Sequence, residues 1–192
     1  MPLSDYTEPS TVSSSDTLAA TDHNSEIVES IKHLKGVNDS HTVILHREAV
    51  GVAAGTATAT TWNVRPLTSI LANTNAAGLV SIDTVNNRFT LQAGVWRLNV
   101  KCAAFYTTLT WLRLYNVTDA GEQTGFFSIA QTVGGSEAQN IHGSGIIKIT
   151  ASKTFELQMY CTRTQASSGM GNPTSVSTET YLIGELECID KD

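Results

Sequence analysis

Two acidic pairs in this sequence have a spacing that chemistry could use. Glu185 and Glu187 lie two residues apart in an alternating apolar and polar run, so both carboxylates share one face of a strand. A glycosidase uses such a pair, although it would also need aromatic platforms in a cleft. Asp119 and Glu122 fall in a predicted turn, where they could hold calcium. A solvated rim and an ordinary turn are the alternative interpretations of the two pairs.

The candidate nucleophile and the histidines give weaker patterns. Gly143-Ser144-Gly145 lacks the Gly-x-Ser-x-Gly pattern of a hydrolase, and it predicts close packing or a bulge in a strand. His41 and His46 are five residues apart, which places them on opposite faces of a strand and away from a common metal ion. The sequence has no phosphate-binding or dinucleotide-binding motif. We therefore expect no enzyme activity, no metal and no cofactor.

The composition indicates a β-rich protein with few ionic groups. Of the 192 residues 16% are charged, where about a quarter is usual, and 26 Thr and 18 Ser supply hydroxyl groups instead. The net charge of −6 argues against a nucleic-acid partner. No apolar run reaches the roughly 18–20 residues of a membrane span, and the first residues lack the features of a signal peptide. We expect synthesis in the cytoplasm without export and no membrane insertion.

Residues 1–41 are predicted to form an N-terminal arm that includes one short helix. Residues 1–20 are polar, and residues 22–35 have helical periodicity, with Asp22 or Thr21 as a suitable N-cap and Gly36 as a natural stop. The apolar stripe of this helix is narrow, so the helix must pack against another surface to be stable. The stripe consists of Ile27, Val28, Ile31 and Leu34.

Residues 42–192 are predicted to form an all-β domain, because the apolar period changes to two from residue 42 onward. Ten short segments with this alternation, separated by turn residues, favour an antiparallel sandwich or barrel. Residues 53–61 are rich in Ala, Gly and Thr and could be a loop or a tightly packed edge. The predicted strands are 42–50, 62–68, 79–84, 88–92, 94–106, 109–117, 124–130, 141–150, 154–164 and 179–189.

The cysteines and several aromatic residues are assigned to opposite faces of these strands. Cys102, Cys161 and Cys188 fall on core-facing positions, which predicts buried free thiols. Other strands are apolar on both faces, so either a loop of the same chain or a second subunit must cover the outer face. Aromatic residues are the expected anchors of a subunit interface. The predicted trimer-interface residues are Phe105, Trp111, Tyr115, Tyr181 and Ile183.

Several segments resemble the complement globular-head and tumour-necrosis-factor-like jelly rolls. Residues 87–98, NRFTLQAGVWRL, resemble a strand pair of that family, with Trp96 at the usual tyrosine position. Residues 179–186 resemble its last strand, and residues 145–149 with 154–157 resemble its penultimate hairpin. The resemblance implies an antiparallel jelly roll of about ten strands that assembles as a homotrimer.

The arm carries a second resemblance. The run Leu18-Ala19-Ala20-Thr21-Asp22-His23-Asn24, followed by Ile27 and Ile31, resembles the start of bacteriophage tail-fibre and head-fibre proteins. It implies a virion protein made in the host cytoplasm, with the major capsid or tail protein of the same particle as its partner. The expected docking residues are Ile27, Val28, Ile31 and Leu34.

Two roles follow from these resemblances. The first is a structural one, as a trimeric capsid decoration, head-fibre or short tail-fibre protein. The second is a receptor-binding jelly-roll tip of a tail fibre, with a cell-surface glycan as ligand. The loops 131–140 and 165–178 contain no aromatic residue, which argues mildly against a stacking-type sugar site in those loops.

Overall fold

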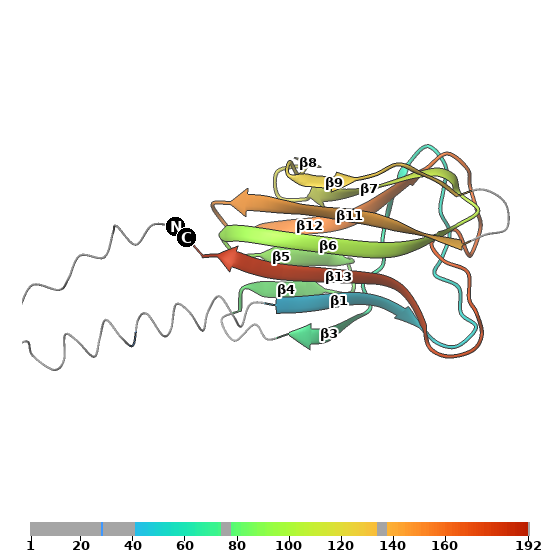
Figure 1. Cartoon of the computed structure of the whole chain (residues 1–192), viewed down its shortest axis with the longest axis horizontal. Helices are drawn as coiled ribbons and strands as arrows, with labels where there is room; N and C mark the ends of the chain where they lie inside the picture. The colour runs from blue at the N-terminus through green and yellow to red at the C-terminus, as the bar shows by residue number, and fades with distance from the viewer. Residues whose placement is uncertain (1–27, 29–40, 74–77, 134–137, 192) are drawn as a thin grey trace, which may run out of the picture. The chain divides into compact units, whose positions relative to one another are not determined.

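The computed structural model describes residues 28, 41–73, 78–133 and 138–191. The 41–191 portion forms two antiparallel sheets, and the arrangement is the predicted jelly-roll sandwich (Figure 1). The six-stranded sheet has the order β3-β1-β13-β6-β11-β9. Its strands are β1 (His41–Glu48), β3 (Ser69–Asn73), β6 (Gly94–Phe105), β9 (Phe126–Ser128), β11 (Ala138–Ile149) and β13 (Glu179–Asp190).

The second sheet has seven strands. Its main path is β10-β7-β12-β5-β4, while β2 pairs with β12 and β8 pairs with β7. Its strands are β2 (Trp62–Val64), β4 (Val80–Asp83), β5 (Arg88–Leu91), β7 (Thr108–Asn116), β8 (Gly121–Glu122), β10 (Gln131–Val133) and β12 (Lys153–Cys161).

Each of the ten predicted strands overlaps an observed strand, and three further strands are present. The additional strands are β3, β8 and β10, all of them short. β3 and β10 lie at the edges of their sheets, where a strand has only one neighbour and needs little apolar alternation. Residues 53–61 form a loop apart from an isolated bridge between Ala57 and Gln165.

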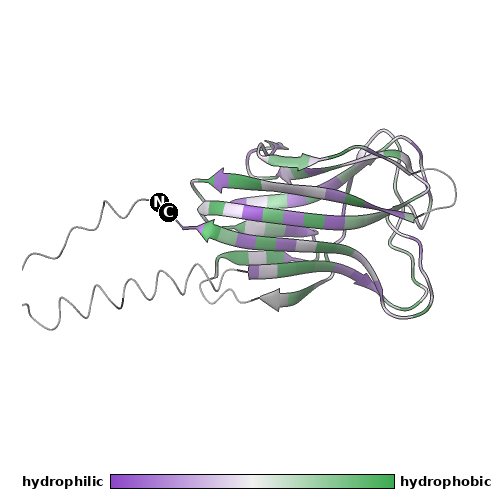
Figure 2. Ribbon diagram, viewed as in Figure 1, coloured by the Kyte–Doolittle hydropathy of each residue, from purple (hydrophilic) through white to green (hydrophobic). Residues whose placement is uncertain are grey.

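The core lies between the two sheets and is built from the predicted inward-facing residues. Along β6, Trp96 and Leu98 are buried whereas Arg97 and Lys101 are exposed, and Figure 2 shows this alternation as hydrophilic and hydrophobic bands. The three cysteines are free and buried, as predicted, and burial raises the pKa of each thiol. Buried neutral thiols of this kind pack as small apolar groups.

The turn before β5 is hydrogen-bonded, through Asn87, to the segment that follows β2. Asn87 adopts a left-handed backbone conformation with φ of 58°, which asparagine tolerates better than most residues. Its side-chain oxygen accepts a 3.0 Å hydrogen bond from the backbone N–H of Leu67. The predicted turn at Asn86-Asn87 therefore also fixes the segment that follows β2.

The predicted arm, residues 1–41, falls almost wholly outside the described residues. Val28 is described, and it is helical with an exposed side chain. The other predicted docking residues, Ile27, Ile31 and Leu34, lie outside the described part of the chain. Among the described residues, no helix has the length and apolar character needed to cross a membrane.

Candidate interaction surfaces

The five predicted interface residues do not share one surface. Phe105 and Ile183 lie on the outer face of the six-stranded sheet, because their strand neighbours Ala104 and Leu182 face the core. Trp111 and Tyr115 lie on β7, in the seven-stranded sheet on the other side of the sandwich. The predicted interface residues other than Tyr181 thus form two groups on two outer faces, and their place in a trimer interface stays a prediction.

Tyr181 is buried inside the subunit, so the prediction that it points outward is wrong. The register between β1 and β13 shifts at this point, since His46 pairs with Leu182 but Arg47 pairs with Thr180. The resulting bulge leaves Tyr181 as an extra residue and reverses its face. Its ring is 4% exposed, its hydroxyl donates to the Val52 carbonyl at 2.8 Å, and burial raises the pKa of Tyr181 to about 12.

Polar side chains that are hydrogen-bonded between neighbouring strands occupy the middle of the outer face of the six-stranded sheet. Glu187 accepts a 2.8 Å hydrogen bond from Arg97, and Glu185 accepts a 3.0 Å bond from Asn99. His142 on β11 lies 2.6 Å from the side-chain oxygen of Asn99. The two glutamates that could have formed a glycosidase pair are therefore engaged with neighbours on an open sheet face.

Apolar side chains gather instead at the two edges of this sheet. The β9 patch is defined as Phe127, Ile129 and Ile146, and Phe127 and Ile129 are 74% and 81% exposed. The β3 patch is defined as Ile70 and Leu71, which are 42% and 67% exposed. Exposed apolar clusters beside a polar region are typical of protein–protein contact sites. The two patches lie at opposite ends of the strand order β3-β1-β13-β6-β11-β9.

The other chemical candidates have structural roles. The carboxylate of Asp119, a predicted calcium ligand, accepts hydrogen bonds from Lys153 at 2.6 Å and from Asn116 at 2.9 Å. His41 is exposed and His46 is buried, in agreement with their predicted placement on opposite faces. Within the described part of the chain, no cluster of three or more His, Cys, Asp or Glu residues could hold a metal ion.

Gly143 and Gly145 are needed for close packing, as the sequence predicts. A Cβ atom on Gly143 would lie 2.5 Å from the ring of Phe126, and one on Gly145 would overlap the backbone carbonyl of Gly125. Ser144 between them is exposed and pairs with Phe127 across the β11–β9 ladder. The glycines therefore let β9 lie directly against β11, which sets the position of the β9 patch.

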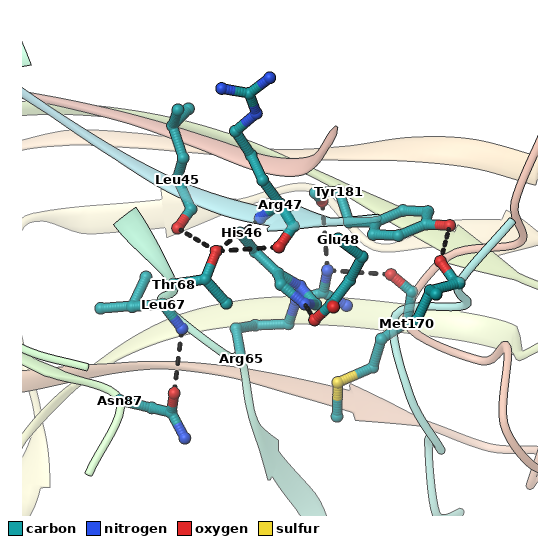
Figure 3. Close-up of polar contacts among 11 residues, drawn as sticks. Leu45, His46, Arg47, Glu48, Arg65, Leu67, Thr68, Asn87, Met170 and Tyr181 are labelled. Atoms are coloured by element: carbon teal, nitrogen blue, oxygen red, sulfur yellow. Dashed lines mark hydrogen bonds and ion pairs between the residues drawn. The ribbon is translucent and has the colours of Figure 1, made fainter. Parts of the chain in front are cut away.

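A fully buried arginine is the feature that sequence reasoning missed. Arg65 lies within a predicted strand but directly before Pro66, and its guanidinium points between the sheets (Figure 3). It donates to three carbonyls, at 3.2 Å to Ala103, 2.9 Å to Met170 and 3.2 Å to Tyr181. These acceptors come from segments far apart in sequence, so no local pattern around residue 65 could have identified them.

The chain resembles known proteins in its fold rather than in its sequence. No protein-family model matches the chain, and no curated protein matches it. The globular domain of zebrafish complement 1qA protein aligns over 80% of this chain and 98% of its own, with 13% identity and a TM-score of 0.52. Murine APRIL at pH 5.0 aligns over 77% of this chain and 99% of its own, with 10% identity and a TM-score of 0.46. The chain has a complement-head-like jelly roll.

The buried histidine of this jelly roll predicts a pH-dependent stability. His46 is fully buried, and burial together with the nearby charge of Arg65 lowers its pKa from 6.5. Its hydrogen bond to Glu48, with the two atoms 3.0 Å apart, acts in the opposite direction but is outweighed. The unfolded chain thus binds a proton at a higher pH than the folded chain does. We expect the free energy of unfolding to fall as the pH drops below about 6.5.

Urea unfolding measured between about pH 8 and about pH 5 tests this expectation, because carboxylates titrate mostly below that window. The matched variant His46→Gln lacks the titrating group and should show a flatter dependence. A wild-type stability that stays constant or rises as the pH falls would contradict the assignment.

Proposed function

We propose that this protein is a non-enzymatic structural component of a bacteriophage particle. In this role it is a homotrimer, either a capsid decoration or head-fibre protein or a short tail-fibre protein. The jelly roll supplies the assembled body, and the N-terminal arm attaches it to the major capsid or tail protein. The arm's resemblance to the start of phage fibre proteins supports the virion location.

The observation that carries the self-association is the pair of apolar patches at opposite edges of one sheet. The β9 patch and the β3 patch differ in composition and position, so they suit a contact in which one patch of a subunit meets the other patch of its neighbour. Contacts of this head-to-tail kind close into a ring when the rotation between subunits closes. A ring of three is the state that the resemblance of the sequence to trimeric jelly rolls implies.

We expect Ile146→Asp to convert the assembly into monomers, because the change places a charge in the β9 patch. Ile146 is 54% exposed in the single subunit, so the fold itself should tolerate the substitution. Sedimentation velocity gives the measurement. Val85→Asp is the matched control, since Val85 is 87% exposed in the turn between β4 and β5 and belongs to neither patch. An Ile146→Asp protein that keeps the mass of the wild type would remove the β9 patch from the interface.

The arm is tested separately by deleting residues 1–36. We expect the truncated protein to remain a folded assembly, because the core and both apolar patches lie within residues 41–191. It should fail to decorate particles that lack their own copy, since three arms per assembly provide multivalent attachment. Electron micrographs of such particles after incubation measure the occupancy. Rebinding of the truncated protein at wild-type occupancy would place the docking surface on the jelly roll.

A further inference from the structure

Three aromatic side chains form a row across the outer face of the seven-stranded sheet. Tyr160 on β12 pairs with Trp62 on β2 at one side and with Trp111 on β7 at the other. The ring centroids of Trp62 and Tyr160 are 5.4 Å apart, and those of Tyr160 and Trp111 are 5.6 Å apart. All three side chains are half-buried, so each ring keeps part of its surface open to solvent.

This row forms one wall of a groove with a volume of about 450 Å³. Polar groups from β7, β8 and β9 lie along the groove, so its lining is mixed rather than purely apolar. A volume in this range is typical of small-ligand sites, which combine aromatic walls with a few polar groups that fix orientation. The groove is bordered by Trp62, Tyr160, Trp111, Arg113, Glu122 and Ser128.

Arg113 is held rigidly at the floor of the groove. Its guanidinium carbon lies 3.9 Å from the ring centroid of Trp62 and 4.9 Å from that of Tyr115. Two of its nitrogens donate to the side-chain oxygen of Gln158, at 2.9 Å and 2.7 Å. Gln158 is itself buried and donates to Glu156, which is held by Arg88. The side chain is therefore fixed in place before any ligand arrives.

The remaining terminal nitrogen of Arg113 lies 4.0 Å from a carboxylate oxygen of Glu122. This separation leaves room for both groups to engage a ligand, one as a donor and the other as an acceptor. The side chain of Glu122 is 61% exposed, so its oxygens remain accessible. Because the two charges are of opposite sign, the groove has no net preference for a charged ligand.

We propose that this groove binds a neutral glycan through a hexopyranose unit. A pyranose has an apolar face of C–H groups that can lie on an indole or phenol ring, and hydroxyls at its edge that both donate and accept hydrogen bonds. Trp111 and Tyr160 supply the aromatic surface, while Arg113 and Glu122 supply a donor and an acceptor for neighbouring hydroxyls. A cationic ligand fits less well, because the guanidinium of Arg113 already covers the ring of Trp62.

The inference does not rest on the proposed particle role, because every residue that lines the groove belongs to one subunit. Phe127 of the β9 patch also borders the groove, so the two surfaces meet at this edge. The loops 131–140 and 165–178 contain no aromatic residue, whereas the groove takes its aromatic rings from strands. The rings are brought together by β2, β7 and β12, which are separated by more than 35 residues along the chain.

Saturation-transfer-difference NMR on the full chain tests the proposal. The neutral probes are the methyl glycosides of glucose, galactose, mannose, rhamnose and N-acetylglucosamine; sialic acid and glucuronic acid serve as anionic probes, and choline as a cationic probe. We expect at least one neutral glycoside to receive saturation, strongest on the C–H protons of one face. Trp111→Ala should weaken that binding at least about tenfold, because it removes the stacking surface.

Two further variants keep the test decisive. Glu122→Gln changes an exposed side chain without removing core packing, and it should weaken the same glycoside several-fold. Tyr106→Ala is the matched control, because Tyr106 stacks with Arg163, at 3.5 Å, outside the groove. The proposal is overturned if no neutral glycoside receives saturation, if only the charged probes do, or if neither Trp111→Ala nor Glu122→Gln weakens binding.

Discussion

Replacing Arg65 by methionine is expected to lower the free energy of unfolding by about 3 kcal/mol or more. Methionine retains much of the side-chain volume, so the main loss is hydrogen bonding rather than a cavity. The carbonyls of Ala103, Met170 and Tyr181 would each lose the guanidinium as a partner in a region without access to water. Each buried carbonyl that is left unpaired costs about 1–3 kcal/mol.

The β-bulge explains why an arginine is needed at this point. At the bulge, the ladder between β1 and β13 skips Tyr181, and the guanidinium of Arg65 donates to its carbonyl. Arginine keeps its proton even though burial lowers its pKa, and its planar head reaches several acceptors at once. Arg65→Lys should therefore restore only part of the stability, because one ammonium group cannot reproduce the same geometry.

Urea unfolding followed by tryptophan fluorescence measures the effect of the Arg65 variants. Arg97→Met is the matched control, since Arg97 forms an exposed ion pair with Glu187 and such pairs contribute little. An Arg65→Met protein as stable as the Arg97→Met control would show that the three carbonyls do not depend on the guanidinium.

The second large effect is expected for Gly145→Ala. The added Cβ atom would overlap the carbonyl oxygen of Gly125 and lie 2.7 Å from the Cα atom of Phe126. Both are backbone atoms, so β9 must move away from β11 rather than yield by a side-chain rotation. Overpacking of this kind costs about 1–3 kcal/mol. Because Phe127 moves with β9, the variant should also weaken the self-association that depends on the β9 patch.

Thermal unfolding and sedimentation together separate these two consequences of Gly145→Ala. Ser144→Ala serves as the control, because Ser144 is exposed and lies between the two glycines on the same strand. If Gly145→Ala melted at the temperature of the control and kept its mass, the close contact between β9 and β11 would not be needed for stability or assembly.

Hydrophobic alternation was sufficient to predict the antiparallel sandwich. The alternating residues of β6 and β12 placed Trp96, Cys102 and Cys161 in the core, where the structure has them. The same rule failed at Tyr181, because the bulge interrupts the count by two at that residue while Leu182 and Ile183 keep their predicted faces. Bulges depend on how two distant strands pair, which a run of residues on one strand does not encode.

The candidate surfaces were harder to predict for the same reason. Trp111 was correctly expected on an outer face, but its partners Trp62 and Tyr160 join it only through the pairing of β2, β12 and β7. The buried partners of Arg65 are equally distant in sequence. The apolar side chains of Phe127 and Ile146 were present in predicted strands, yet only the pairing of β9 with β11 brings them to one edge.

The central claim, that the jelly roll assembles as a homotrimer, is tested most directly by the mass of the native full-length chain in solution. Light scattering coupled to size-exclusion chromatography gives that mass without assuming a shape. The account predicts a single species of three times 20.6 kDa, about 62 kDa, which stays constant on dilution through the micromolar range. A folded species of 20.6 kDa at all concentrations would contradict the account, because neither apolar patch would then have a partner subunit.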